Sequence, residues 1–235
     1  LLIKNKETFL NTKNCIKDED KTKIILIEHK WSKDFETRFI NHERYSNKKM
    51  KDLLPKLPNN SYIVDVGAHV GDTGLYLALL LKNKWNSKNI KVIMIAPDST
   101  KLDFINKIAK INNLDNIITK HYAVSNKTGI SKLIKKQHPG AWKIKENSGN
   151  IPMDTIDNIC KNKNISMMHI DVEGMEYQAL LGCKNIIKNV EYIMIELTNI
   201  TKRNNVNIFL NENNFTEIID KKINKENGNC LFKKK

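Results

Sequence analysis

The stretch YIVDVGAHVGDT at residues 62–73 decides the fold of this chain. Its apolar first half predicts a strand, which carries the acidic side chain of Asp65 to a turn that contains Gly67 and Gly71. The segment LYLALLL at residues 75–81 is apolar enough to form a helix buried against a sheet. A strand, a glycine turn and a helix place free backbone N–H groups at one point, so this pattern favours a site for an anionic or nucleoside-bearing cofactor.

The spacing of the glycines narrows the choice of cofactor. Folds that bind NAD or flavin use G-x-G-x-x-G because the pyrophosphate approaches the second glycine, whereas three residues separate Gly67 from Gly71. A phosphate-binding P-loop is excluded because no Gly-Lys-Ser/Thr follows. The run resembles instead the first motif of the S-adenosylmethionine-dependent methyltransferases with a Rossmann-like fold. Such turns also occur in many other α/β proteins, so this run alone leaves a purely structural turn as the alternative.

A second strand-turn-helix run lies at residues 167–182 and reads MMHIDVEGMEYQALLG. With the loop at 64–72, the segment AVSNKTG at 123–129 and the segment PMDTI at 152–156, it closely resembles the FkbM-type family of methyltransferases. That family is marked by a D-V-G-A-x-x-G-D loop, an A-V-S-x-x-x-G segment, a T-L-D-like segment and an I-D-V-E-G-x-E-x-x-x-L-x-G run. All four occur here in the family's order, so the resemblance does not depend on one motif.

Strand and helix signals alternate along the chain, which predicts a mostly parallel sheet with helices on both faces. The resemblance implies the same α/β architecture, a Rossmann-like class I methyltransferase fold with a seven-stranded sheet and a C-terminal antiparallel hairpin. We expect this domain at residues 60–235, after an N-terminal extension at 1–59. The predicted strands lie at 23–28, 60–67, 91–96, 117–125, 166–171 and 192–197, with a closing antiparallel pair at 215–223 and 229–233. The predicted helices lie at 47–54, 73–83, 98–112, 174–188 and 206–213, and a hairpin is expected within 126–152.

Composition limits the remaining choices. A chain of 235 residues is long enough for one domain with a full hydrophobic core and an extension. Its four cysteines are far apart and show no C-x-x-C spacing, so neither a zinc site nor a disulfide framework is indicated and we expect a reducing, cytoplasmic setting. No apolar run approaches about 18 residues and no signal peptide is visible, so we expect no membrane insertion. Leu1 stands in place of Met, which indicates a trimmed chain or a piece of a longer protein.

The formal net charge of +14 raises the question of a nucleic-acid partner. Only three of the 40 basic residues are arginines, the residue that forms bidentate contacts with bases and phosphates. Lysine, asparagine and isoleucine are abundant, as expected for a genome rich in A and T. We therefore expect a solvated lysine surface and rank nucleic acid as the second choice of partner; the family resemblance implies a small-molecule or glycan acceptor as the first.

The resemblance implies S-adenosylmethionine as the cofactor, held outside the carboxyl ends of the strands. Asp65 would face its amino-acid end, and Gly67, Ala68 and Gly71 would let it approach the backbone. On this basis Gly67→Val should weaken binding while the fold survives. Asp72 either contacts the cofactor or only caps the first helix of the domain.

One position departs from the family pattern. Family members carry an acidic residue at the end of the second strand that binds both ribose hydroxyls, whereas this chain has Ala96 before Pro97. Loss of two charge-assisted hydrogen bonds costs very roughly 1.5–3 kcal/mol each before compensation by water. Asp98 offers a carboxylate from a different angle, although a helix cap explains it equally well. Ser125, at the end of the third strand, would lie at the same cleft.

Methyl transfer is an in-line displacement, so catalysis depends largely on positioning, and a hydroxyl acceptor also needs a proton acceptor. Asp171 and Glu173 leave the central fourth strand where the methyl group should lie; stabilisation of the turn and of the next helix is the alternative role for both. His121 and His138 remain open as bases, and His169 is expected to be buried and hydrogen-bonded. No metal-ligand cluster is evident, so we expect transfer without a metal.

Two signatures that would indicate a nucleobase as the acceptor are missing from the sequence. Amino-group methylation of bases comes with N/D-P-P-Y/F, and cytosine C5 methylation uses a Pro-Cys nucleophile. The resemblance instead implies O-methylation, with the hydroxyl of a sugar or glycan as the expected acceptor; Trp142 either stacks on a sugar ring or anchors its loop. The ribose 2′-hydroxyl of RNA is the alternative among enzymes, and a non-catalytic binding module, marked by Ala96, is the alternative outside them.

Overall fold

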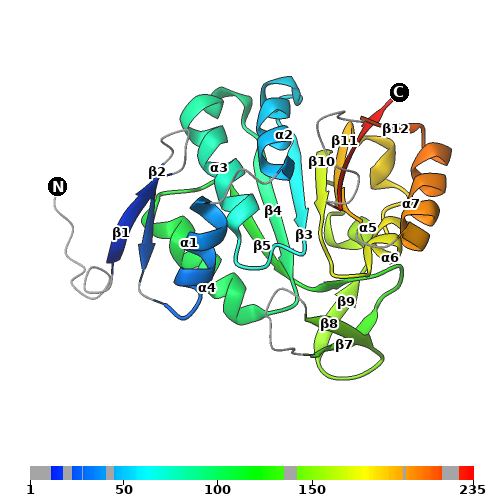
Figure 1. The fold of residues 1–235 in the computed structure, drawn as a ribbon, viewed down its shortest axis with the longest axis horizontal. Helices are drawn as coiled ribbons and strands as arrows, with labels where there is room; N and C mark the ends of the chain where they lie inside the picture. The colour runs from blue at the N-terminus through cyan, green and yellow to red at the C-terminus, as the bar shows by residue number, and fades with distance from the viewer. Residues whose placement is uncertain are drawn as a thin grey trace.

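A computed structural model describes residues 12–17, 23–27, 29–40, 45–134, 142–197, 200–218 and 228–235. Its centre is a seven-stranded sheet with the order β12-β13-β11-β10-β3-β4-β5 (Figure 1). The strands are β3 (Tyr62–Val66), β4 (Lys91–Ala96), β5 (Ile117–His121), β10 (Ile165–Ile170), β11 (Tyr192–Glu196), β12 (Phe215–Glu217) and β13 (Asn229–Lys234). Neighbouring strands from β11 to β5 run parallel, whereas β13 pairs antiparallel with β11 and β12. The predicted α/β fold is confirmed.

Helices cover both faces of the sheet, because its strands are apolar on both sides. Alternate residues of β3 divide between two cores: Ile63 belongs to one, and Val64 and Val66 belong to the other. Asp65 is therefore turned to the same face as Ile63. That face carries α1 (Ser32–Ile40), α2 (Tyr45–Leu53), α3 (Asp72–Lys84) and α4 (Ser99–Ile111), and the opposite face carries α5 (Ile156–Ile159), α6 (Glu176–Leu181) and α7 (Ile200–Glu212) (Figure 1).

The predicted strand at 117–125 is divided in the structure, so a single strand over this range is wrong. β5 stays in the main sheet, whereas β6 (Ala123–Val124) joins a separate four-stranded sheet with the order β6-β9-β7-β8. The change of sheet occurs at Tyr122, whose N–H donates to the Ala96 carbonyl at 3.2 Å. The predicted hairpin is present, and the new strands are β7 (Gly129–Ile134), β8 (Lys143–Glu146) and β9 (Ile151–Asp154).

The predicted helix at 174–188 is also divided. Helix α6 is followed by Gly182 as its C-cap, and the 3₁₀ turn η4 (Ile186–Lys188) comes next. A Cβ at Gly182 would lie 2.3 Å from the carbonyl oxygen of Ser125, so any residue larger than glycine would clash with the backbone at Ser125. The Asp157 carboxylate stabilises the break, because it accepts backbone hydrogen bonds at the start of η4.

The C-terminal elements agree with the prediction in kind and differ in extent. Helix α7 begins at Ile200, earlier than the predicted start at 206. β12 ends at Glu217, and most of its predicted extension to 223 lies outside the described residues. Within the described part of the chain, none of the helices has both the length and the apolar character needed to span a membrane.

The N-terminal segment begins with an antiparallel pair of strands, β1 (Thr12–Lys17) and β2 (Lys23–Ile27), followed by α1 and α2. The predictions of a strand at 23–28 and of a helix at 47–54 are confirmed in kind, and Pro55 stands in the 3₁₀ turn η1 (Leu54–Lys56) after α2. Helix α1 has no counterpart among the predicted elements.

Side chains of α1 and α2 join the core beneath α3. Phe35, Phe39 and Met50 are fully buried there, and the ring of Phe39 meets that of Tyr76 edge to face, with 6.2 Å between their centroids. This packing holds α1 close to the start of α3, where the glycine turn lies. A domain boundary near residue 59 stays a prediction.

Candidate active site

The loops after β3, β4 and β10 surround two adjoining clefts, where open α/β sheets bind ligands. The larger one, here called the apolar cleft, holds about 780 Å³ of empty space including the part open to solvent. The smaller one, called the polar cleft, holds about 480 Å³ on the same measure. The apolar cleft is lined by side chains such as Ile95, Val124, Leu133, Ile144, Val172 and Met175. The polar cleft is lined by Asp65, Asp72, Thr73, His169, Glu196 and Asn229. Both are lined by Arg38, Gly67, His69 and Asp171.

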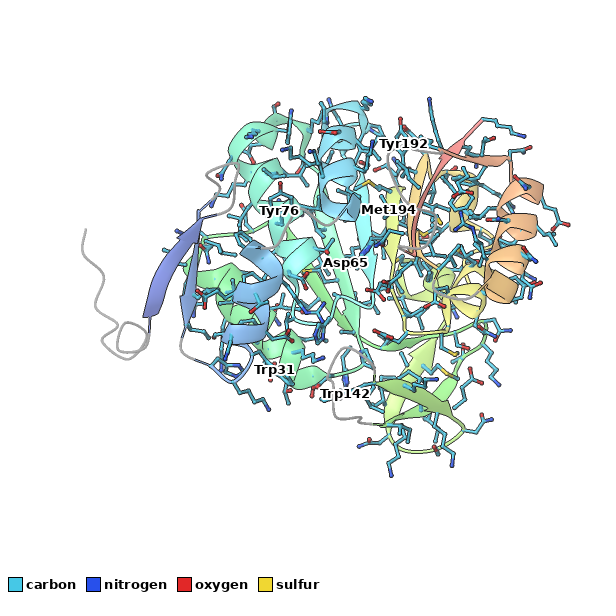
Figure 2. All side chains as sticks on the ribbon, viewed as in Figure 1. Trp31, Asp65, Tyr76, Trp142, Tyr192 and Met194 are labelled. Carbon is cyan, nitrogen blue, oxygen red and sulfur yellow. The ribbon has the colours of Figure 1, made fainter. Side chains whose placement is uncertain are left out.

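Asp65 and His169 form a buried pair in the polar cleft; Asp65 lies near the centre of the view in Figure 2. They are neighbours on β3 and β10, and His169 Nδ1 lies 2.8 Å from Asp65 Oδ1. Burial opposes a charge on His169, but the hydrogen bond and charge of Asp65, helped by Asp171 and Asp72, outweigh it and raise the pKa of His169. The expectation of a buried, hydrogen-bonded histidine is confirmed. Asp65 Oδ2 is buried and has no hydrogen-bond partner among the described residues.

The glycine turn after β3 lies directly against the loop after β10. Gly67 has a φ of +88°, and the N–H groups of Gly67 and Ala68 both donate to the Ile95 carbonyl at 3.0 Å. A Cβ at Gly67 would lie 1.8 Å from the carbonyl oxygen of Asp171, so the neighbouring backbone itself requires glycine here. That the fold survives valine at this position stays a prediction, and a loss of stability is expected in addition.

Gly71 and Asp72 stand at the start of α3. Gly71 is the N-cap, and a Cβ there would lie 2.7 Å from Ile105 Cγ1 and 2.9 Å from Met94 Cε. This glycine fits α3 closely onto α4 and β4 and lines neither cleft. Asp72 is buried and lines the polar cleft; burial raises its pKa although the charge of Arg38 opposes the shift.

Three residues predicted to lie at the cofactor cleft, namely Ala96, Asp98 and Ser125, have different surroundings. Ala96 is 2% exposed and lines the apolar cleft. Asp98 lines the same cleft, but its Oδ1 accepts hydrogen bonds from the N–H and the hydroxyl of Thr100 at 2.9 and 2.8 Å, as a helix N-cap does. Ser125 is fully buried and lines neither cleft, and its hydroxyl donates to Glu146 Oε1 at 2.7 Å.

Asp171 and Glu196 bring two carboxyl groups together in the polar cleft. Asp171 follows β10 and Glu196 ends β11, neighbouring parallel strands in which Ile170 pairs with Ile195. Burial, the charge of Glu196 and a hydrogen bond with it raise the pKa of Asp171 well above its ordinary value. Asp171 Oδ1 is buried without a hydrogen-bond partner in the described part of the chain. A carboxyl group with a raised pKa and a buried oxygen without a partner is suited to accept a proton from a ligand.

The other predicted catalytic residues do not belong to this pair. Glu173 lines the apolar cleft and has a φ of +50°, a left-handed conformation that is uncommon outside glycine. His121 is exposed at the end of β5, with its Nε2 at 3.0 Å from the Pro97 carbonyl oxygen, and lines neither cleft. His138 lies outside the described residues. The structure thus brings Asp171 and Glu173 to the clefts and leaves His121 at the surface.

The family model of the Methyltransferase FkbM domain matches residues 65–228, more than half of the chain. The chain belongs to this family. The match starts at Asp65 and includes the glycine turn, Ala96 and the carboxyl pair. The resemblance seen in the sequence is confirmed, and so is the prediction of S-adenosylmethionine, the cofactor of this family. A search of curated proteins finds no match.

Solved structures with a similar fold include further methyltransferases. The FkbM methyltransferase of Methylobacillus flagellatus aligns with a TM-score of 0.54 and 17% identity, over 88% of this chain and 55% of its own. An rRNA methylase of Streptococcus thermophilus aligns with a TM-score of 0.50 and 14% identity, over 80% and 93% of the two chains. A Streptococcus mutans protein solved in complex with SAH aligns with a TM-score of 0.50 and 15% identity, over 80% and 96%. The chain therefore has the class I methyltransferase fold and spans about half the length of the FkbM structure.

Helix α1 supplies cleft residues that the sequence did not indicate, and it lies outside the matched FkbM domain. Arg38 lines both clefts, and its Nε donates to Asp34 Oδ1 at 3.0 Å. Asp34 Oδ2 lies 2.9 Å from His69 Nε2, so α1 is tied to the glycine turn. Burial lowers the pKa of His69, and the positive charges of Lys101 and Arg38 lower it further. Together they outweigh the hydrogen bond and the charge of Asp34, which raise it. The spacing of Asp34 and Arg38, typical of an ion pair on a helix, was the one signal in the sequence.

Lys101 on α4 is another cleft residue without a sequence signal. It is 4% exposed, its Nζ contacts His69 Nδ1, and it lies 5.0 and 4.6 Å from the ring centroids of Trp31 and Trp142. Burial lowers the pKa of Lys101 to about 8. Trp31 and Trp142 lie near each other in Figure 2, with 6.1 Å between their ring centroids. Trp142 thus lines the apolar cleft from an anchored position.

Ala96 remains this FkbM protein's departure from the family pattern, now placed at the apolar cleft. Ala96→Asp and Ala96→Glu are expected to tighten S-adenosylmethionine binding about tenfold, because a carboxylate there accepts hydrogen bonds from both ribose hydroxyls and part of the gain is lost to desolvation. Isothermal titration calorimetry measures the change. No gain in either variant, together with loss of binding in Asp98→Ala, would contradict this and assign the ribose to Asp98.

Proposed function

We propose that this FkbM-family protein is an S-adenosylmethionine-dependent O-methyltransferase that methylates a hydroxyl group of a sugar or glycan. The observation that carries the proposal is the pair of Asp171 and Glu196 in the polar cleft, in which Asp171 has a raised pKa and a buried Oδ1 without a partner among the described residues. Transfer to a hydroxyl needs a proton acceptor beside the reacting oxygen, and a carboxyl group with a raised pKa can supply one. The family resemblance supports O-methylation.

The residues of the two clefts fit the two ends of the cofactor. The apolar cleft offers side chains such as Ile95 and Val172 to an adenine ring, and its size is in the range of small-molecule sites. The polar cleft offers the unpaired Asp65 Oδ2 to the ammonium group of the amino-acid end. S-adenosylmethionine supplies an electrophilic methyl group on its sulfonium sulfur. The residues of this chain bind both ends and orient the acceptor hydroxyl.

Asp171 takes up the proton in this proposal. The acceptor hydroxyl would donate a hydrogen bond to Asp171 Oδ1, and that oxygen would take up its proton when the methyl group passes from the sulfonium sulfur to the hydroxyl oxygen, breaking the bond between carbon and sulfur and leaving neutral S-adenosylhomocysteine. A positioned base of this kind contributes about 10²–10⁴-fold to the rate, in addition to the gain from orientation. Glu173, which lines the apolar cleft, is proposed to hold the acceptor in place.

The ribose 2′-hydroxyl of RNA is the second candidate acceptor. The net charge of +14 favours it, and the same fold occurs in an rRNA methylase. It ranks below a glycan because only three arginines are available for phosphate and base contacts. A non-catalytic module that only binds the cofactor is the third candidate, favoured by Ala96 alone.

Transfer of a labelled methyl group tests the proposal. The full chain is incubated with methyl-labelled S-adenosylmethionine and either a mixture of oligosaccharides or total RNA. Label is expected in a stable methyl ether on the oligosaccharides and not in the RNA. Label in 2′-O-methyl nucleosides would select the second candidate, and cofactor binding in calorimetry with no transfer to either acceptor would select the third.

Glu196→Gln tests the carboxyl pair through the pH dependence of transfer. The base form of Asp171 appears only as the pH rises through its raised pKa, so turnover should rise with pH over that range. Removing the charge of Glu196 lowers the pKa of Asp171. We therefore expect the rising limb of the pH profile of kcat to move to lower pH. If the rising limb stays at the same pH in Glu196→Gln, Glu196 does not raise the pKa of Asp171, and the proposed pair is contradicted.

The same substitution should change the pH dependence of stability. Because the raised pKa means that folded Asp171 binds its proton more tightly than the unfolded chain does, its stabilising contribution is complete below the ordinary carboxyl pKa and is lost as the pH rises through the raised one. Glu196→Gln should reduce the fall in the free energy of unfolding as the pH rises from the ordinary carboxyl pKa of about 4 through the raised one. Glu212→Gln is the matched control, because Glu212 is exposed at the end of α7.

A further inference from the structure

Arg38 places a guanidinium group where the two clefts adjoin, although it comes from a helix outside the matched FkbM domain. Its side chain is 16% exposed, and its Nε donates to Asp34 Oδ1 at 3.0 Å. The terminal nitrogens Nη1 and Nη2 have no hydrogen-bond partner among the described residues. Since Nε is already held by Asp34, these two nitrogens are oriented as a fork, the geometry that suits a carboxylate.

The charges around Arg38 do not neutralise it fully. Burial opposes its charge, but Asp72 and Asp34 outweigh this effect and raise the pKa of Arg38. Asp34 is shared with His69, whose Nε2 lies 2.9 Å from Asp34 Oδ2. Burial raises the pKa of Asp72, which favours its neutral form. The guanidinium group is therefore charged. Of its two main counter-charges, that of Asp72 is weakened because the raised pKa favours the neutral carboxyl group.

The start of α3 adds a second attraction for an anion in the polar cleft. This helix has 13 residues, and its N-cap, Gly71, makes no side-chain capping hydrogen bond. Asp72 and Thr73 of its first turn line the polar cleft together with Arg38. The N–H groups and the dipole at a helix N-terminus favour a negative charge in front of them.

The polar cleft also contains an acceptor without a partner. Asp65 is 1% exposed, and its Oδ2 makes no hydrogen bond within the described part of the chain. A cleft with a buried carboxylate oxygen, a guanidinium fork and a helix N-terminus matches a zwitterionic amino acid, whose ammonium group donates and whose carboxylate accepts. We propose that Arg38 binds the α-carboxylate at the amino-acid end of the cofactor, opposite Asp65, so that helix α1 completes the cofactor site. This inference rests on the assignment of S-adenosylmethionine as cofactor.

Two ligands that differ only at the amino-acid end test the inference. S-adenosylhomocysteine carries the α-carboxylate, whereas 5′-methylthioadenosine has the same adenosine and a thioether but no amino-acid group. In calorimetric titrations of the full chain, Arg38→Ala is expected to weaken S-adenosylhomocysteine binding about 10- to 100-fold and to leave 5′-methylthioadenosine binding within about twofold. Arg38→Lys, which keeps the charge and loses the fork, should give an intermediate loss.

Arg203→Ala is the matched control, because Arg203 also pairs with a carboxylate, Glu217 at 2.6 Å, and lines neither cleft. It should bind both ligands as the wild type does. If Arg38→Ala does not fold, the inference is tested with Arg38→Lys, by comparing its affinity for S-adenosylhomocysteine with its affinity for 5′-methylthioadenosine. Equal loss for both ligands, or no loss for either, would overturn the role of Arg38. Wild-type protein that binds neither ligand would overturn the cofactor assignment as well.

Discussion

Asp171→Asn is expected to lower the turnover of methyl transfer by about 10²–10⁴-fold and to leave S-adenosylhomocysteine affinity within about threefold. The amide has nearly the size of the carboxyl group but cannot take up a proton at Oδ1, an atom that is buried and unpaired among the described residues. Burial and Glu196 hold the pKa of Asp171 above its ordinary value, so the carboxylate is a stronger proton acceptor than an exposed one.

Single-turnover transfer of a labelled methyl group measures the rate for Asp171→Asn, and calorimetry measures the affinity. Asp115→Asn is the matched control, because Asp115 is exposed and lines neither cleft; both quantities should stay at their wild-type values. If turnover falls only as much as affinity does, Asp171 serves binding and is not the proton acceptor.

Local patterns were sufficient for the central sheet. β3, β4, β10 and β11 lie within about two residues of their predicted bounds, because each is an apolar run that ends in a glycine, a proline or an acidic turn. The two divided elements show where local patterns fail. The apolar character continues through Tyr122, and the helical pattern continues through Gly182. The N–H of Tyr122 donates a hydrogen bond to the Ala96 carbonyl, and Gly182 packs closely against the carbonyl oxygen of Ser125. Both partners are distant in sequence, so a local pattern does not show them.

The motif residues of the site could be predicted because a glycine turn is recognised from residues that are consecutive in the sequence. Asp65, Gly67 and Asp171 meet in the structure as neighbours on adjacent strands or loops. Glu196 was also within reach of sequence reasoning, since it ends a predicted strand that must lie beside β10. A carboxylate at that edge of a parallel sheet is placed for ligand binding.

Arg38 and Lys101 could not be predicted, because their role depends on tertiary packing. Helix α1 reads SKDFETRFI, in which Arg38 looks like any solvated helical residue. It reaches the clefts because Phe35 and Phe39 on the same helix are buried beneath α3. Lys101 is buried where two tryptophans, Trp31 and Trp142, approach it from other parts of the chain.

Gly67→Val is expected to lower the free energy of unfolding by about 2–6 kcal/mol. Holding a β-branched residue at a φ of +88° costs about 1–3 kcal/mol, and moving apart the overlapping groups costs a similar amount. The overlap cannot be relieved by a change of rotamer, because the Cβ itself would lie 1.8 Å from the backbone oxygen of Asp171. Any loss of cofactor binding in this variant would follow from displacement of Asp171 as well as from contact with the cofactor.

Thermal unfolding measures the effect of Gly67→Val, which should lower Tm by about 5–20 °C for a protein of this size. Gly129→Val is the matched control, because Gly129 is exposed at the start of β7 and a Cβ there would meet only Met153 Cε at 3.4 Å. Its Tm should stay within about 2 °C of the wild type, since surface substitutions usually change stability by less than about 0.5 kcal/mol. A Gly67→Val protein as stable as Gly129→Val would mean that the loops after β3 and β10 can separate at little cost, and the close approach of Gly67 to Asp171 would then not be what sets the geometry of the site.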